Sequence, residues 1–410
     1  MRNIELLVPA SSLEVLKVAV IFGADAVYIG GEVYGLRAKA KNFSKDDMAE
    51  GIAFAHAHGV KVYVTANILA HNGDLPGVRR YFEELKELKP DALIIADPAV
   101  FTIAREVCPE IDVHISTQAN NTNYGTYNFW HGLGATRVVS ARELSLKEIK
   151  EIRQNILDDL EIETFIHGAM CISYSGRCLL SNYFTGRDAN RGACTHPCRW
   201  KYAVVEEQRP GEYLPVYENE RGTYIFNSKD LCMIEHIPEL IDAGIDSFKI
   251  EGRMKTALYV ATVARTYRKA IDDYLESEEK YHANMPWYQE QISNCTYRQF
   301  TTGFFFGKPD ETTQIYDSNT YNKEYTYLGI VGEIKDGLCR IEQRNKFSVG
   351  ETIEIMKPDG RNIEAEVLRI LNEEGKEQES APHSKQLLYV ELSEIPDVYD
   401  ILRRKEEESK

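Results

Sequence analysis

The chain has 410 residues, of which 43% are hydrophobic, and its 64 acidic and 48 basic side chains give a formal net charge of −16. This length and apolar fraction predict an ordinary globular protein with two or three domains, and the lack of any apolar run of about 18 residues excludes a membrane span. The acidic balance opposes binding of a polyanion such as RNA by the molecule as a whole, so an RNA contact needs a local basic segment.

The N-terminal segment indicates a cytoplasmic protein. Its apolar run is interrupted by Arg2, Glu5, Glu14 and Lys17, unlike the apolar core of a secretory signal peptide. Reducing cytosol disfavours stable disulfides, and clustered cysteines in a cytosolic enzyme more often bind metal or act in catalysis. We therefore expect metal or catalytic roles for clustered cysteines, and neither a membrane nor DNA as a partner.

Short β-rich apolar runs alternate with helical segments over the first part of the chain. Continuous apolar strands separated by amphipathic helices are typical of a parallel sheet covered on both faces. Eight such units fit a (β/α)8 TIM-like barrel better than an open doubly wound sheet. The runs are residues 4–8, 25–31, 61–67, 92–97, 112–118, 137–141, 164–168 and 247–252.

Polar residues follow these strands, at the barrel end where such folds place their active sites. Taken singly, a residue of this kind is more often a polar loop residue without a role. The set is Asn67, Asp97, Gln118, Asn120, Arg142, His167, Glu251, Arg253 and Lys255. Of these, the candidates for catalysis are Gln118, His167, Glu251 and Arg253.

A long insertion separates the seventh and eighth strands and divides the chain unevenly. We expect residues 1–280 to form the barrel, with a Cys-rich insertion at 169–230 that emerges at the catalytic end. Residues 281–324 are expected to be a connection. The alternating short strands of residues 325–402 predict a small β-barrel domain, and residues 403–410 a charged tail.

The insertion concentrates the cysteines. Cys171, Cys178, Cys194 and Cys198 lie within 28 residues, and Cys232 follows 34 positions later. We expect Cys232 in the first turn of a helix that begins at the same end of the barrel. Isolated cysteines are often buried and inert, but a group this dense indicates a metal site or a nucleophile.

The cysteine spacing leaves the kind of site open. Structural zinc sites usually show two close Cys pairs, and only Cys194 and Cys198 approach that spacing. A radical-SAM motif would need a cysteine where the chain has Lys201. An iron–sulfur cluster accepts four cysteines without one obligatory spacing. A cysteine nucleophile beside His167 or His196 would indicate a peptidase instead.

Three segments of the chain resemble segments of the collagenase-like peptidase family U32. They are ETFIHGAMCISYSGRCLLSNY, RDANRGACTHPCRW and KIEGRMK. The resemblance runs over nearly the whole chain, and the Cys-rich segment is most similar to the prephenate-dependent tRNA uridine hydroxylase branch. This implies a cytoplasmic, oxygen-independent hydroxylase that forms 5-hydroxyuridine at the tRNA wobble position, with a [4Fe–4S] cluster and prephenate as co-substrate. It also implies that the peptidase name is misleading.

The resemblance also assigns metal ligands. The cysteines of the family's cluster fall on Cys171, Cys178, Cys194 and Cys232, with Cys198 as the alternative fourth ligand. The chemistry of the residues agrees, because hydroxylation of a pyrimidine without activated oxygen needs redox chemistry that side chains do not supply.

Arginines near the cysteines suit the dicarboxylate co-substrate, because a guanidinium binds carboxylates in a bidentate manner. The candidates for binding prephenate are Arg177, Arg187, Arg199 and Arg253. The basic rim for tRNA is Arg187, Arg191, Arg199 and Lys201, with Arg37, Lys39 and Lys41 as further candidates. The aromatic residues that could stack on an extruded base are Tyr174, Tyr183 and Trp200.

Two other hypotheses stay open. One is a collagenase-like peptidase, as the family name says. The other is a non-catalytic subunit that binds RNA or a paralogous family partner and keeps its cysteines for a structural site. Absorption near 400 nm after anaerobic purification, against hydrolysis that survives metal removal, separates the hydroxylase from the peptidase.

Overall fold

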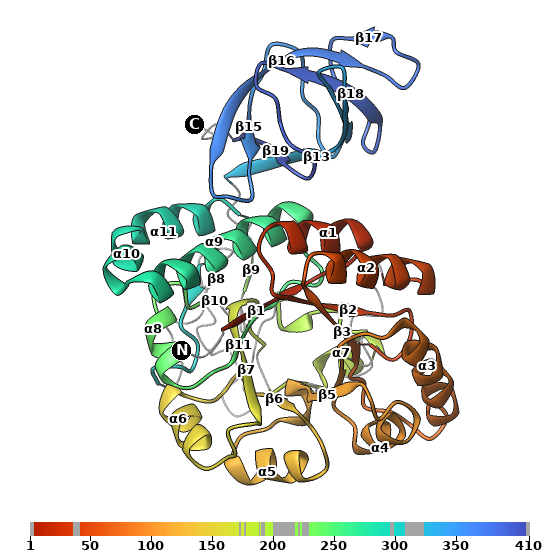
Figure 1. Ribbon diagram of the computed structural model, residues 1–410, viewed down its shortest axis with the longest axis vertical. Helices are drawn as coiled ribbons and strands as arrows, with labels where there is room; N and C mark the ends of the chain where they lie inside the picture. Colours follow the sequence, from red (N-terminus) through yellow and green to blue (C-terminus); the bar gives the residue numbers. More distant parts are fainter. Residues whose placement is uncertain are drawn as a thin grey trace, which may run out of the picture. The chain divides into compact units, whose positions relative to one another are not determined.

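The computed structural model describes residues 4–35, 42–171, 174–175, 178–187, 189, 193–199, 218–219, 222–223, 229–295, 299–307 and 324–406 (Figure 1). Its contacts divide the chain into two units. Unit 1 comprises Met1–Leu16, Ala24–Lys255 and Arg298–Thr320, and unit 2 comprises Lys17–Gly23, Thr256–Tyr297 and Tyr321–Lys410. Within the described ranges, no helix has the length and apolar character needed to cross a membrane.

Unit 1 is built around a closed barrel of parallel strands, which confirms the predicted fold (Figure 1). The last strand, β11, pairs with both β1 and β7, and this pairing closes the sheet. Strands such as β2 and β4 are buried along their whole length, as expected where helices cover the outside. The barrel strands are β1 (Glu5–Pro9), β2 (Ala26–Gly30), β3 (Lys61–Ala66), β4 (Ala92–Ile95), β5 (Asp112–Ile115), β6 (Arg137–Val139), β7 (Glu161–Gly168) and β11 (Ser247–Ile250).

Helices surround this barrel, and several begin at a side-chain cap. The helices that start in unit 1 are α1 (Leu13–Ile21), α2 (Lys45–Ala57), α3 (Leu75–Leu88), α4 (Pro98–Val107), α5 (Tyr124–Gly132), α6 (Leu146–Gln154), α7 (Leu180–Thr185) and α8 (Ile237–Asp242), with 3-10 turns η1 (Thr117–Ala119) and η3 (Pro197–Arg199). Ser44 and Asp47 form a capping box at α2, and Ser145 and Glu148 form another at α6. Each box satisfies backbone N–H groups that the first helical turn leaves unpaired, and so fixes where the helix begins.

Buried charges fill the barrel interior near the start of the strands. Arg137 is 2% exposed and donates to Glu5 at 2.5 Å and to Glu163 at 3.2 Å. Lys249 donates to the second oxygen of Glu163 at 2.6 Å, and Tyr63 donates to Glu5 at 2.6 Å. Burial raises the pKa of Glu5, but the charge and hydrogen bonds of Arg137 outweigh burial and hold that pKa below its ordinary value. Each charge in the network is therefore matched by an opposite one.

Short strands extend the sheet beyond β7: β10 (Asp230–Cys232) pairs with β7, and β12 (Phe300–Thr301) pairs with β10. Strands β8 (Glu218–Asn219) and β9 (Gly222–Thr223) pair with each other. The prediction that Cys232 lies in the first turn of a helix is wrong, because Cys232 ends strand β10, and α8 begins only at Ile237. Backbone pairing with β7, with Cys232 opposite His167, keeps this residue extended. Much of the predicted insertion lies outside the described residues.

Unit 2 contains helices and an antiparallel sheet. Its sheet runs in the order β15-β19-β13-β14-β18-β16-β17, and a further pairing of β15 with β16 closes it into the predicted small barrel. Apolar side chains such as Leu328, Phe347 and Ile355 fill its core. The elements are α9 (Ala257–Glu276), α10 (Glu278–Ala283), α11 (Met285–Ser293), β13 (Tyr325–Lys335), β14 (Leu338–Glu342), β15 (Thr352–Met356), β16 (Asn362–Leu371), β17 (Glu377–Gln378), β18 (Leu387–Leu392) and β19 (Ile401–Lys405).

A buried carboxylate holds the helices of unit 2 together. Asp273 on α9 is 2% exposed and accepts hydrogen bonds from Tyr288 at 2.6 Å and from Asn284 at 2.8 Å. Lys269 and Lys280 pair with it at 2.9 and 3.1 Å. Burial raises the pKa of Asp273, but these hydrogen bonds prevail and lower it to about 2. One carboxylate thus ties α9 to the start of α11.

The barrel network predicts unequal effects at two neighbouring carboxylates. Glu163→Gln should lower the free energy of unfolding by about 3 kcal/mol or more, because it leaves Lys249 buried without its counter-charge. Glu161→Gln is the matched control, since Glu161 also pairs with Arg137 but is 46% exposed, and should cost less than about 1 kcal/mol. Urea unfolding followed by circular dichroism measures both variants, and equal losses would contradict the assigned role of Glu163.

The lowered pKa of Asp273 predicts that the protein loses stability in acid. Its pKa rises from about 2 in the folded protein to the ordinary value of 3.8 on unfolding, so the carboxylate contributes stability above pH 3.8 that disappears as the pH falls toward 2. Asp273→Asn should cost about 2 kcal/mol at pH 7 and progressively less between pH 4 and pH 2. Asp272→Asn, which removes an exposed carboxylate paired with Arg268, should change stability little at any pH. A pH-independent loss for Asp273→Asn in urea unfolding would contradict this assignment.

Candidate active site at the carboxyl end of the barrel

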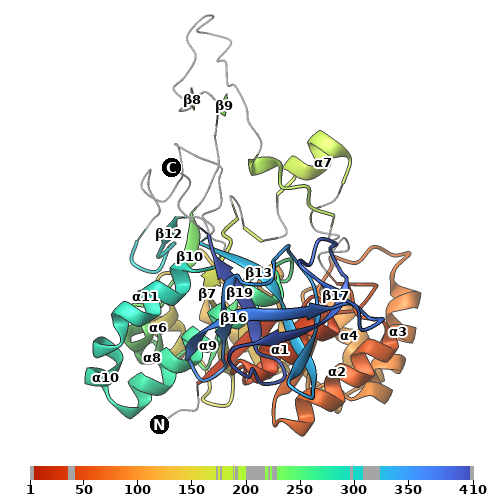
Figure 2. The same cartoon turned by 90° about the horizontal axis from the view of Figure 1, so that it is seen from above.

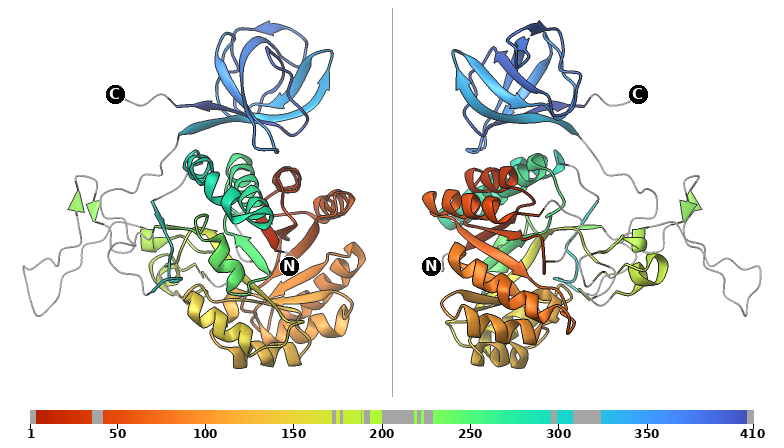
Figure 3. Two further views of the ribbon diagram at one scale, coloured as in Figure 1. Left: turned by 60° about the vertical axis from the view of Figure 1, so that its left-hand side comes forward. Right: turned by 90° about the vertical axis from the view of Figure 1, so that its right-hand side faces the viewer.

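The carboxyl ends of the barrel strands lie on the side of unit 1 that also carries α7, β10 and β12 (Figures 2 and 3). Parallel strands bring residues that are far apart in sequence to this one end. The polar residues expected here do lie at strand ends, but they fall into distinct groups with different partners.

His167 lies at the end of β7 and is buried, with 1% of its surface exposed. Its ring lies 5.7 Å from the ring of Phe300. Burial and, to a smaller extent, the charge of Lys255 lower the pKa of His167, the charge of Glu251 raises it, and the net result is a pKa of about 3. His167 is therefore a neutral imidazole at physiological pH, suited to hydrogen bonding and not to carrying a positive charge.

Glu251 is brought against β7 by the backbone. Its N–H donates to the carbonyl of His167 at 2.8 Å. Gly168 has a φ of +110°, and a Cβ at this position would lie 2.5 Å from the carbonyl oxygen of Glu251. Only glycine allows both the conformation and the close approach. The ends of β7 and β11 therefore place two of the predicted catalytic residues, His167 and Glu251, next to each other.

Arg253 reaches across the barrel end from β11 and is 5% exposed. Its guanidinium donates to Thr65 Oγ1 at 3.2 Å and to Asn42 Oδ1 at 3.1 Å. A Cβ on Gly30 would lie 2.3 Å from Arg253 Nη2, so the guanidinium occupies the space that a side chain on Gly30 would need. Two neutral acceptors and a glycine thus hold a buried guanidinium over the ends of β2 and β3. The sequence analysis did not identify Thr65 or Asn42, although Thr65 lies in the predicted strand of residues 61–67.

Gln118 and Asn120 hold part of the Cys-rich segment. Gln118 Nε2 donates to Ser175 Oγ at 2.8 Å, and Asn120 Nδ2 donates to the Ser175 carbonyl at 3.2 Å. Ser175 lies between Cys171 and Cys178 in the sequence. Residues that follow β5 therefore hold Ser175 in place, through contacts that no sequence pattern indicated.

Three further strand-end candidates have identifiable structural contacts. Asn67 donates to Ser116 Oγ at 3.2 Å. Asp97 accepts hydrogen bonds from the backbone N–H groups of Ala99 and Val100 and so caps α4. Arg142 donates to the Ala169 carbonyl at 2.8 Å and stacks over the ring of Phe165 at 4.0 Å. Asp97 is thus a helix cap, and Arg142 positions the chain just before Cys171.

The cysteines divide into two classes by burial, and the structure records all eight as thiols. Cys108, Cys295 and Cys339 are buried, and burial raises the pKa of Cys108 to about 11 and that of Cys339 to about 12. The other five, from Cys171 to Cys232, are exposed or partly exposed. Thiolates are the ligands that iron–sulfur clusters use, so the second class has the right donor chemistry.

The five accessible cysteines, all of which the structure describes, have suitable chemistry, but they are not arranged around a common point. Among the described residues, no group of three or more His, Cys, Asp or Glu side chains is arranged to hold a metal ion. The structure thus does not gather the five accessible cysteines, and their role as cluster ligands stays a prediction. In such sites the binding of the metal supplies free energy that organises the ligand loop.

The predicted arginine and aromatic residues are only partly described. Arg187 is exposed at the end of α7, and Tyr174 and Tyr183 are 45% and 81% exposed. Outside the described residues lie Arg37, Lys39, Lys41, Arg177, Arg191, Trp200, Lys201 and the side chain of Arg199. The described part of the rim therefore offers one exposed arginine beside exposed aromatic rings.

Comparison with known proteins agrees with this architecture. Residues 11–315 match the model of peptidase family U32, and residues 323–403 match the model of the peptidase family U32 C-terminal domain. A protein of Bacillus subtilis named tRNA hydroxylation protein P1 is 42% identical over 390 residues, which cover 95% of this chain and 92% of that protein. The tRNA hydroxylation protein P of Escherichia coli is 40% identical and covers 92% of this chain and 91% of its own length. A second Bacillus subtilis protein, tRNA hydroxylation protein P2, is 38% identical over 75% of this chain and 98% of its own length. The chain therefore belongs to peptidase family U32.

Proposed function

We propose that this protein is an RNA hydroxylase that forms 5-hydroxyuridine at the wobble position of tRNA, without molecular oxygen and with prephenate as co-substrate. The observation that carries the proposal is the identity of about 40%, over more than nine tenths of the chain, with proteins named for tRNA hydroxylation. The separation of five accessible cysteines from three buried ones supports it.

The proposed cofactor is a [4Fe–4S] cluster on Cys171, Cys178, Cys194 and Cys232, with Cys198 as the alternative fourth ligand. The cluster supplies the electron-transfer chemistry that hydroxylation of a pyrimidine requires and that amino-acid side chains lack. The hydrogen bonds of Gln118 and Asn120 hold Ser175, which lies between the first two of these ligands in the sequence, near the end of β5.

The chain's own residues bind and orient the substrates in this proposal. Arg253 presents a buried positive charge whose position Thr65 and Asn42 fix, and a guanidinium in such a site suits a carboxylate of prephenate. Arg177, Arg187 and Arg199 are the other proposed prephenate ligands. His167 stays neutral, so it can act as a hydrogen-bond partner beside Glu251 without adding charge.

For RNA, we infer a contact at the exposed end of α7. Arg187 supplies a cation there, and Tyr183 and Phe184 form an edge-to-face pair of exposed rings with centroids 5.0 Å apart. Exposed rings next to an arginine suit an unpaired base and its phosphate. A paralogous partner is also proposed, because one organism contains two similar proteins named for tRNA hydroxylation. In this proposal the protein works in the cytoplasm.

Cysteine substitutions distinguish the proposed cluster ligands from the buried cysteines. Cys171→Ser and Cys178→Ser should abolish both the absorption near 400 nm of the anaerobically reconstituted protein and hydroxylation of tRNA, because a serine does not replace a thiolate ligand. Cys108→Ser and Cys339→Ser, at buried positions, should keep both properties. Full hydroxylation by Cys171→Ser would remove the cluster from the mechanism, whereas peptide hydrolysis that survives metal removal would favour the peptidase.

If the exposed charge of Arg187 contacts an RNA phosphate, tRNA binding should depend on salt concentration. Arg187→Glu should weaken tRNA binding and flatten the dependence of log K on log salt by roughly 0.7 to 0.9 for each phosphate that is no longer neutralised. Arg340→Glu, an exposed position on β14, is the control with the same charge change and should leave the slope unchanged. Filter binding over a range of salt concentrations measures both variants. Identical slopes for Arg187→Glu and wild type would place the RNA elsewhere.

A further inference from the structure

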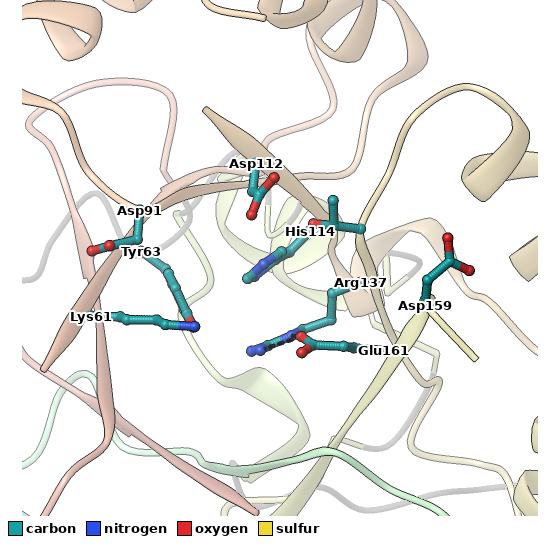
Figure 4. Close-up of a pocket in the computed structure, with 9 residues that line it drawn as sticks. Lys61, Tyr63, Asp91, Asp112, His114, Arg137, Asp159 and Glu161 are labelled. Carbon is teal, nitrogen blue, oxygen red and sulfur yellow. Dashed lines mark hydrogen bonds and ion pairs between the residues drawn. The ribbon is translucent and has the colours of Figure 1, made fainter. Parts of the chain in front are cut away.

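A polar pocket of about 230 Å³ opens at the amino-terminal end of the barrel, opposite the candidate active site (Figure 4). The first residues of several strands line it, among them Lys61 of β3, Asp112 of β5 and Arg137 of β6. The volume corresponds to about eight water-sized groups, enough for a short organic molecule. None of the roles proposed above for the carboxyl end uses this pocket.

Two buried polar atoms at this pocket lack a protein partner. His114 Nδ1 and Thr136 Oγ1 are buried and form no hydrogen bond with any described residue. His114 is 4% exposed, and its ring is packed edge-on against Tyr63 with centroids 4.6 Å apart. Figure 4 shows this ring directed into the space between Lys61 and Arg137. Buried polar groups are nearly always hydrogen-bonded, so these two atoms indicate a missing hydrogen-bonding partner.

The charges around the pocket favour a cation. Four carboxylates line it, those of Asp91, Asp112, Asp159 and Glu161. The basic residues that line it are Lys61 and Arg137, and Arg137 is already paired with Glu5, Glu161 and Glu163 inside the barrel. Asp91 pairs with His56 at 2.8 Å and Asp159 with His131 at 3.4 Å, and each histidine adds a positive charge only when it is protonated. Asp112 forms no ion pair or side-chain hydrogen bond with another described residue. A positively charged ligand would reduce this excess of negative charge.

The spread of the carboxylates argues against a single metal ion. Asp91 precedes β4 and Asp159 precedes β7, and Figure 4 shows the two on opposite sides of His114. The described residues also contain no group of three or more such side chains arranged around one point. An extended molecule with a positive charge at each end reaches separate carboxylates, which one ion does not.

We propose that this pocket binds a short aliphatic diamine, with one ammonium group at Asp112 or Asp91 and the other near Asp159. An ammonium group has three donors, which can serve the carboxylates together with Thr136 Oγ1 and the ring nitrogen of His114. Burial, and then the charges of Arg137, Lys249 and Lys61, lower the pKa of His114, so its ring is neutral and has one nitrogen able to accept.

Isothermal titration of the full chain with putrescine tests the proposal. Putrescine should bind with one site per chain, and n-butylamine should bind at least about fivefold more weakly because it carries one ammonium group in place of two. The double substitution of Asp112→Asn with Asp159→Asn should weaken putrescine binding about tenfold, and His114→Phe about fivefold. Asp112 is exposed, so Asp112→Asn alone should fold and still weaken binding about threefold if His114→Phe does not fold.

The control separates a site from general attraction to an acidic protein. Asp336→Asn makes the same charge change in an exposed turn of unit 2, where the residue has a φ of +51° that asparagine also adopts. It should leave putrescine binding unchanged. Three results would overturn the proposal: no binding of putrescine, equal weakening by Asp336→Asn and Asp112→Asn, or one-to-one binding of Mg²⁺ that Asp112→Asn abolishes.

Discussion

The pairing of Arg137 and Lys249 with Glu5 and Glu163 is the interaction on which the barrel depends. These side chains come from β1, β6, β7 and β11, so one network joins the first strand to the last three. Burial of any one charge alone would be costly, and the network makes that burial tolerable because each charge has an opposite neighbour at hydrogen-bond distance. A closed barrel needs its first and last strands to meet, and this network lies where they do.

The network also separates two ends of the barrel with different chemistry. Lys249 of the network lies over the ring of Tyr28 at 4.4 Å. Nearer the carboxyl end of the barrel, Arg142 lies over the ring of Phe165. At that end, glycines at positions 30 and 168 let Arg253 and Glu251 approach the neighbouring strands. At the amino-terminal end, acidic side chains remain in excess. The same sheet therefore presents a buried arginine at one end and a carboxylate-lined pocket at the other.

Periodicity in the sequence was sufficient for the fold, because the barrel strands are short continuous apolar runs and the strands of unit 2 alternate. It was insufficient for the residues that hold the sites. The contact between Gln118 and Ser175 joins residues 57 positions apart in the sequence, and Thr65 meets Arg253 only after the barrel closes. Cys232 was assigned to a first helical turn because Asn227 or Ser228 is a suitable helix cap in the sequence, but pairing with β7 keeps Cys232 in a strand. The pocket at His114 could not be predicted either, since nothing local distinguishes its ring from a satisfied core histidine.

The central claim is that this chain hydroxylates tRNA. Mass spectrometry of nucleosides from a strain that lacks the protein tests it most directly, with the strain carrying the wild-type gene or the Cys171→Ser gene as comparison. The account predicts that 5-hydroxyuridine or nucleosides derived from it disappear from tRNA without the gene, return with the wild-type gene and stay absent with Cys171→Ser. An unchanged level of these nucleosides in the deletion strain, with any paralogous gene also removed, would contradict the account.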